Sequence, residues 1–118
     1  PIYARGWNWV PSQSLNTRVI HQHLVRHFDA YRAGHFTSLR VWGGGVYVSD
    51  DFLNLADEYG IIISHDFQFG DQFYPVNDEF LLGVAAEVRD QVWRMGSHPS
   101  LGVWCGNNEM VCCVAVVW

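Results

Sequence analysis

Short segments with the composition of buried β-strands alternate along this chain with longer segments that have the periodicity of amphipathic helices. The strand-like segments are rich in β-branched and aromatic residues, and the apolar run Ile61–Ile63 fits a strand buried on both faces of a parallel sheet. Strands are expected at residues 4–11, 36–42, 61–67 and 101–106, and helices at 16–33, 50–60 and 78–95. This alternation predicts an α/β fold with a parallel sheet.

The ends of the expected helices carry local signals. Asn16 or Thr17 is expected to cap the first helix, and Gly34 is expected to end it in the left-handed conformation. The second helix begins with acidic residues, which favour the positive end of the helix dipole, and Gly60 is expected to end it. Pro99 follows the third helix and cannot continue it.

Two architectures use this alternation. A doubly wound dinucleotide-binding sheet carries a G-x-G-x-x-G turn after its first strand, whereas the glycine run of this chain, at 43–45, follows the second strand and lacks that spacing. The other architecture is the (β/α)8 TIM barrel, in which functional groups lie where the strands end. Each expected strand ends in polar or aromatic side chains, namely Asn8, Trp9, Arg40, Trp42, His65, Asp66, Asn107, Asn108 and Glu109. We therefore expect a TIM-barrel type fold with only about its first four β/α units, because a whole barrel takes roughly 250 residues.

The residue types at these strand ends suit carbohydrate chemistry. Amide and arginine side chains can hydrogen-bond sugar hydroxyls, and aromatic rings can cover apolar sugar faces. Glycosidic cleavage usually requires two carboxyl groups, one of them acting as acid and base. Glu109 is the better-placed candidate for the acid, and Asp66 is the next carboxylate at a strand end. Taken alone, a glutamate at a strand end such as Glu109 is more often a solvated loop residue, and Trp42 could equally belong to the core.

Composition excludes several other classes of protein. The chain has 118 residues and a net charge of −5, and all seven of its positive charges are arginine, so a nucleic-acid partner is not expected. No apolar run approaches the ~20 residues that span a bilayer, so no membrane partner is expected. His23 and His27 are one helical turn apart, but no acidic or cysteine partner accompanies them, and neither a metal nor a cofactor is expected. Nothing in the sequence fixes the cellular compartment.

Five motifs resemble the β-mannosidases of glycoside hydrolase family 2. They are GWNWVPS (6–12), LRVWGGGVYVSDDF (39–52), DEYGIIISHDFQF (57–69), YPVNDEF (74–80) and HPSLGVWCGNNE (98–109). The runs RVWGGG and GNNE point to the mannosidase branch, since related β-galactosidases and β-glucuronidases share the Asn-Glu pair without the Trp-Gly-Gly-Gly run. The resemblance extends from about Tyr3 to Glu109.

This resemblance implies roles for individual residues. Glu109 matches the general acid/base, and Asn108 matches the amide that reads the sugar 2-hydroxyl. Arg40 matches the arginine that supports the catalytic carboxylates, and Trp42 matches an aromatic lining the mannose subsite. Asn8 and Trp9 belong to the matching first-strand motif, and together with Asp66 they are expected to contribute to the substrate-binding site. Asp66 keeps its place, although Ser64 and His65 stand where the family usually has Trp and Gln.

The implied function is that of a retaining exo-β-mannosidase, which removes terminal β-D-mannose from oligosaccharides. Residues 1–110 are expected to form the N-terminal half of the catalytic barrel, and residues 111–118 an apolar tail that does not match the family. The nucleophilic glutamate is expected on a later strand that this chain lacks, and the rest of the barrel and the β-sandwich domains are expected as partners. The alternative is a non-catalytic truncated fragment or sugar-binding remnant. For an animal source, the resemblance implies a lysosomal location.

Overall fold

The structure is a computed structural model, and it describes residues 1–110. The predicted 111–118 tail lies outside the described residues. Four parallel strands form one sheet in the order β1-β2-β3-β4, so each strand pairs with the next strand along the chain. The strands are β1 (Gly6–Trp9), β2 (Ser38–Val41), β3 (Ile62–Asp66) and β4 (Leu101–Cys105), and the helices are η1 (Asn16–Arg18), α1 (His21–Ala33), α2 (Asp50–Tyr59) and α3 (Asp78–Met95). The predicted α/β fold with a parallel sheet is confirmed.

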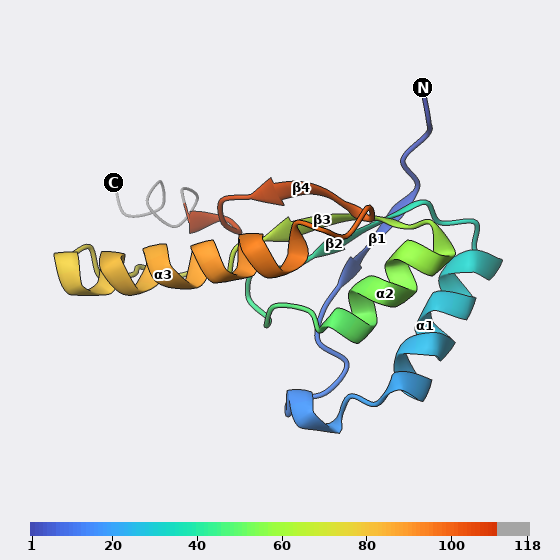
Figure 1. The fold of residues 1–118 in the computed structure, drawn as a ribbon, viewed down its shortest axis with the longest axis horizontal. Coiled ribbons are helices and arrows are strands. Elements are labelled where there is room, and N and C mark those ends of the chain that lie inside the picture. The colour runs from blue at the N-terminus through green and yellow to red at the C-terminus, as the bar shows by residue number, and fades with distance from the viewer. Residues whose placement is uncertain (111–118) are drawn as a thin grey trace.

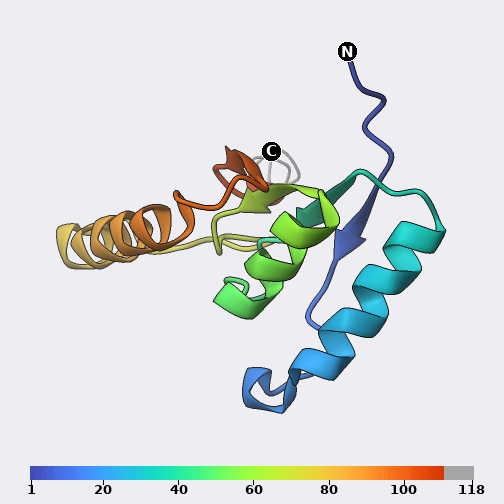
Figure 2. The same cartoon turned by 45° about the vertical axis from the view of Figure 1, so that its right-hand side comes forward.

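Helices α1 and α2 lie side by side against one face of the sheet (Figures 1 and 2). Their contact is largely aromatic, because Phe28 of α1 meets Phe52 and Tyr59 of α2 at ring-centroid distances of 5.0 and 5.5 Å. The inward side chains of β2 and β3, among them Leu39 and Ile63, are buried in the same cluster. This core holds the first three strand ends in fixed positions relative to one another.

Helix α3 extends away from the other two helices (Figure 1). Only Met95, at its C-terminal end, is buried, whereas Leu82 and Trp93 on its predicted apolar face are 72% and 85% exposed among the described residues. The last turn is attached through Arg94, which pairs with Asp50 and donates to the Val48 carbonyl over 2.8 Å. The structure therefore holds α3 mainly at its C-terminal end.

The predicted start of the first helix is wrong, whereas its predicted end at Ala33, next to Gly34, is confirmed. Asn16–Arg18 form a separate short 3-10 helix, and α1 begins at His21 after an extended Ile20 that makes no side-chain cap. Val19, which follows the 3-10 turn in an extended conformation, packs against the core. Gly34 has φ −81°, and the left-handed residue is the following His35, with φ +56°.

The other helix ends match the predictions more closely. Ser49 accepts a hydrogen bond from the Phe52 N–H and caps α2, and Gly60 ends that helix in the left-handed conformation, with φ +68°. Asn77 caps α3 by accepting from the Phe80 N–H over 2.9 Å. Within residues 1–110, no helix is long and apolar enough to cross a membrane.

Candidate active site

Arg40 stands at the centre of a polar cluster built from all four strands. Its guanidinium donates to the Asp66 carboxylate at the end of β3, at 2.5 and 3.3 Å. It also donates to the side-chain oxygen of Asn108, beyond β4, at 2.7 Å, and to that of Asn8 on β1 at 3.4 Å. Because the strands are parallel, their carboxyl ends meet at one edge of the sheet. The structure thus brings together four of the predicted site residues.

Asp66 is the buried member of this cluster and contacts the Arg40 guanidinium from inside the protein. Its side chain is fully buried, at 0% exposure, and one oxygen that contacts Arg40 also accepts from the Gly43 N–H at 3.1 Å. Burying a carboxylate is costly unless it is paired with a cation and accepts hydrogen bonds, as Asp66 is here. Asp66 does not line the cleft described below, so the structure places it behind Arg40 and not at the position expected of a substrate ligand.

The loop after β3 contributes a residue that sequence reasoning missed, Asp71. Its carboxylate accepts from the Asn108 side-chain N–H at 2.7 Å. The two loops are also joined through their backbones, because Gly70 and Asn108 form an isolated parallel bridge. No sequence motif around Asp71 indicates that it belongs to a functional site. Its only sequence signal is its place in the polar loop that follows a strand end, which a barrel makes functional.

An open cleft of about 420 Å³ lies above the cluster. Glu109 lines it and is exposed, so its carboxyl group is accessible to a ligand. Its backbone has φ +56°, and Asp71 has φ +57°, a region that non-glycine residues adopt at a cost of order 1–3 kcal/mol and that is frequent at functional sites. The cleft is lined by Asn8, Val10, Arg40, Trp42, Asp71, Asn108 and Glu109.

The glycine run explains how Trp42 reaches the cleft. A Cβ on Gly44 would lie 2.1 Å from Cζ2 of the Trp42 ring, so the ring lies directly against the Gly44 backbone. A Cβ on Gly43 would lie 2.7 Å from the Phe67 carbonyl, and one on Gly45 would lie 2.8 Å from the Pro11 ring. The three glycines are therefore required for space, since none of them has a positive φ.

Two predicted strand-end residues lie elsewhere. The Trp9 side chain is buried in the core, where its ring meets Phe52 at 4.9 Å and His27 at 5.2 Å, and the structure does not bring it into the cleft. His65 is fully buried between the rings of Tyr47 and Trp104, at 5.5 and 5.3 Å. Side chains of successive strand residues point to opposite faces, which explains why Asn8 faces the cleft and Trp9 does not.

Burial shapes the chemistry of His65. Desolvation lowers the pKa of its ring below the usual 6.5, although the adjacent Asp66 carbonyl and carboxylate favour the charged form. Its Nδ1 lies 2.7 Å from the Asp66 carbonyl, and its Nε2 accepts from the Val48 N–H at 3.4 Å. Since Nε2 is an acceptor, Nδ1 carries the proton and the ring is neutral. His65 thus helps to fix the backbone at Asp66.

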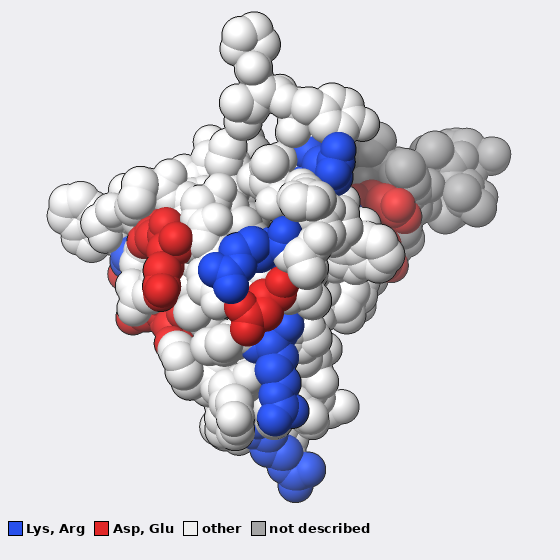
Figure 3. Space-filling view, turned by 90° about the vertical axis from the view of Figure 1, so that its right-hand side faces the viewer, with Lys and Arg blue, Asp and Glu red and all other residues white. Residues whose placement is uncertain are grey.

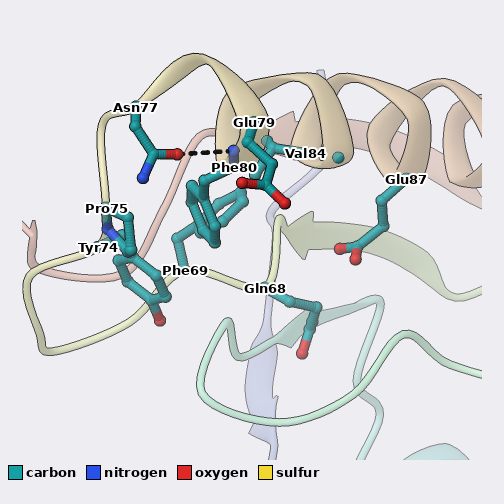
Figure 4. A pocket seen from close by; sticks show the side chains of 10 residues that line it. Gln68, Phe69, Tyr74, Pro75, Asn77, Glu79, Phe80, Val84 and Glu87 are labelled. Atoms are coloured by element: carbon teal, nitrogen blue, oxygen red, sulfur yellow. Dashed lines mark hydrogen bonds between the residues drawn. The ribbon is translucent and has the colours of Figure 1, made fainter.

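A second groove, of about 640 Å³, lies between the loop after β3 and the first turns of α3 (Figure 4). Tyr74, Phe80 and Phe69 provide its aromatic walls, and Glu79 and Glu87 stand along the helix side. It contains no strand-end residue of the Arg40 cluster. The groove is therefore separate from the candidate active site.

Two other features bear on which partners the chain binds, namely its surface charge and the groups that could bind a metal ion. On the side of the molecule where α1 lies, arginine and acidic side chains are intermixed (Figure 3). Within the described residues, no group of three or more histidine, cysteine, aspartate or glutamate side chains could hold a metal ion. The absence of a nucleic-acid partner stays a prediction.

Comparisons with curated proteins show similarity to a segment of the β-mannosidases. The chain is 42% identical over 118 residues to the β-mannosidase of Mus musculus, which covers 100% of this chain and 13% of that protein. It is 48% identical over 109 residues to β-mannosidase A of Aspergillus fumigatus, covering 92% of this chain and 12% of that protein. No family model matches the chain.

Solved structures of a β-mannosidase and of a β-glucuronidase match the fold of this chain. The crystal structure of a β-D-mannosidase from Dictyoglomus thermophilum matches with a TM-score of 0.90 and 38% identity, over 92% of this chain and 13% of that one. A Bacteroides uniformis β-glucuronidase matches with a TM-score of 0.84 over 100% of this chain and 14% of that one, but at 17% identity it shows the fold alone. The chain spans 12 to 13% of the length of the curated relatives named above. The predicted resemblance is confirmed: this chain is related along its length to one segment of the β-mannosidases.

Proposed function

We propose that this chain is part of the catalytic domain of a retaining exo-β-mannosidase, which removes terminal β-D-mannose from oligosaccharides. The observation that carries the proposal is the joining of Arg40, Asn108 and Glu109 at one cleft, in a segment that is 42 to 48% identical to β-mannosidases. A carboxyl group beside an amide and an arginine, next to an aromatic ring, suits recognition and cleavage of a sugar.

In this proposal Glu109 is the general acid and base. It donates a proton to the glycosidic oxygen as the bond breaks, and it later removes a proton from the water that attacks the covalent intermediate. Its exposed position in the cleft allows both transfers. Asn108 hydrogen-bonds the sugar 2-hydroxyl, and the Trp42 ring covers an apolar face of the mannose.

The nucleophile is expected outside this chain, on a later strand of a (β/α)8 barrel. A retaining enzyme places its two carboxyl groups about 5–5.5 Å apart. Asp66 is a poor substitute, because both of its oxygens contact Arg40 and it is fully buried. We therefore propose that the other strands of the barrel complete the site and that β-sandwich domains accompany it. Expressed alone, the 118-residue chain is expected not to hydrolyse mannosides.

A substrate panel tests the proposed function. The complete enzyme that carries this segment is assayed with the p-nitrophenyl β-glycosides of mannose, galactose and glucuronic acid. The proposal predicts turnover of the β-mannoside with a kcat/KM at least about 100-fold above the other two, since a site built to bind specific hydroxyls discriminates strongly. Equal turnover of all three, or a preference for the glucuronide, would contradict it.

A further inference from the structure

The loop after β3 holds the residue before Glu109 by three hydrogen bonds. The Asn108 backbone N–H donates to the Phe69 carbonyl at 2.7 Å, and the Asp71 backbone N–H donates to the Asn108 carbonyl at 3.1 Å. The third bond joins the two side chains, from the Asn108 amide nitrogen to the Asp71 carboxylate, at 2.7 Å. Asn108 is only 6% exposed, so few alternative partners are open to it.

The charges on either side of the Asn108 amide determine which way it faces. A guanidinium has only donors, so Arg40 requires the amide oxygen. A carboxylate has only acceptors, so Asp71 requires the amide nitrogen. The observed arrangement satisfies both, with 2.7 Å on each side. A flipped amide would place a donor against Arg40 and an acceptor against Asp71, and both contacts would be repulsive.

We propose that Asp71 is a positioning residue for the Asn108–Glu109 pair. Arg40 alone restrains one end of the amide, and Asp71 supplies the restraint on the other end. Asp71 also donates its backbone N–H to the Asn108 carbonyl, and Asn108 is bonded directly to Glu109. The position of the proposed general acid therefore depends on Asp71. This inference rests on the proposed function for its effect on catalysis.

The backbone at Asp71 decides which variants test this role. Its φ of +57° is adopted readily by asparagine and glycine but not by alanine. Asp71→Gly therefore removes the carboxylate without adding strain, and Asp71→Asn keeps an acceptor oxygen while removing the charge. The exposed neighbour Gln72 has its amide on Tyr74, so Gln72→Gly is a matched control for added loop flexibility.

The experiment measures kcat and KM of the complete enzyme and these three variants on p-nitrophenyl β-mannoside. Loss of a charge-assisted hydrogen bond predicts that Asp71→Gly lowers kcat/KM roughly 10- to 100-fold, mainly through kcat. Asp71→Asn should recover activity to within about fivefold of the wild type, because a neutral acceptor keeps much of the bond. Gln72→Gly should behave as the wild type does. An Asp71→Gly enzyme with wild-type kcat, or an Asp71→Asn enzyme as impaired as Asp71→Gly, would overturn the proposal.

A structural readout separates this inference from the proposed function. If the wild-type enzyme turns over no β-mannoside, the proposed function fails, and a crystal structure of the Asp71→Gly protein then decides the positioning role. The proposal expects the Asn108 side chain to leave hydrogen-bonding distance of Arg40 or to adopt more than one orientation. An Asn108 side chain that stays in place, 2.7 Å from Arg40, would show that Asp71 does not position it.

Discussion

Adding one methyl group at Gly44 tests how the glycine run shapes the cleft. The new Cβ would lie 2.1 Å from Cζ2 and 2.2 Å from Cη2 of the Trp42 ring. Carbon atoms in contact are about 3.5–4.0 Å apart, so the ring must move by roughly 1.5 Å or the loop must shift. Trp42 lines the cleft with Glu109, and the displaced ring is therefore lost from its place in the cleft.

The size of the effect follows from this overlap. Forcing extra volume into a packed site costs about 1–3 kcal/mol, and each 1.4 kcal/mol of lost transition-state binding is about tenfold in rate. Gly44→Ala is therefore expected to lower kcat/KM for p-nitrophenyl β-mannoside by about 10- to 100-fold in the complete enzyme. Gly83→Ala is the matched control, because nothing lies within 4 Å of a Cβ there and alanine favours the helix.

A double-mutant cycle identifies Trp42 as the cause. Trp42→Ala alone should lower kcat/KM sharply while the protein stays folded. Because that change removes the ring that Gly44→Ala collides with, the double variant should be no worse than Trp42→Ala, and the two effects should not add. Full additivity of the two changes, or wild-type kinetics of Gly44→Ala, would refute the argument. Loss of soluble Trp42→Ala protein would instead place this ring in the core.

Two further predictions concern stability. Arg40→Met leaves the buried Asp66 carboxylate with the Gly43 N–H as its remaining partner. Because the Arg40 side chain is 37% exposed, the free energy of unfolding should fall by about 2–3 kcal/mol, measured as a lower thermal midpoint. Adding Asp66→Asn to the Arg40→Met protein should partly restore that midpoint. Burial lowers the pKa of His65 below 6.5, so the unfolded state binds more protons, and stability should fall as pH drops below 6.5, by at most about 1.4 kcal/mol per pH unit. His65→Gln should remove that part of the pH dependence, and an unchanged pH profile would contradict this origin.

The alternation of strands and helices was predictable because it depends on local periodicity. The exception is the start of α1, where residues 16–20 have the apolar spacing of a helix but form a 3-10 turn and an extended link. The spacing at Val19 reflects packing against the core, which periodicity cannot distinguish from helical packing. The left-handed residue is His35 and not Gly34, and the helix is closed there by local hydrogen bonds from the His35 and Phe36 N–H groups to the Arg32 and Tyr31 carbonyls.

The candidate site was predictable only in part. The sequence places three of the cluster residues at the ends of strand-like segments, namely Asn8, Arg40 and Asn108. Their meeting at one edge of the sheet could therefore be expected. The role of Asp71 could not, because it depends on how two loops far apart in the sequence pair. The burial of Asp66 behind Arg40 is likewise a property of the packed sheet and not of its position at a strand end.

The most direct test of the account replaces the proposed acid while keeping its shape, as Glu109→Gln in the complete enzyme. A general acid contributes about 10²–10⁴-fold, so turnover of a mannoside with a poor leaving group should fall by that factor. Cleavage of 2,4-dinitrophenyl β-mannoside should be affected much less in its first step, because that leaving group needs little protonation. Unchanged turnover of both substrates would contradict the assignment of Glu109 as the general acid and base.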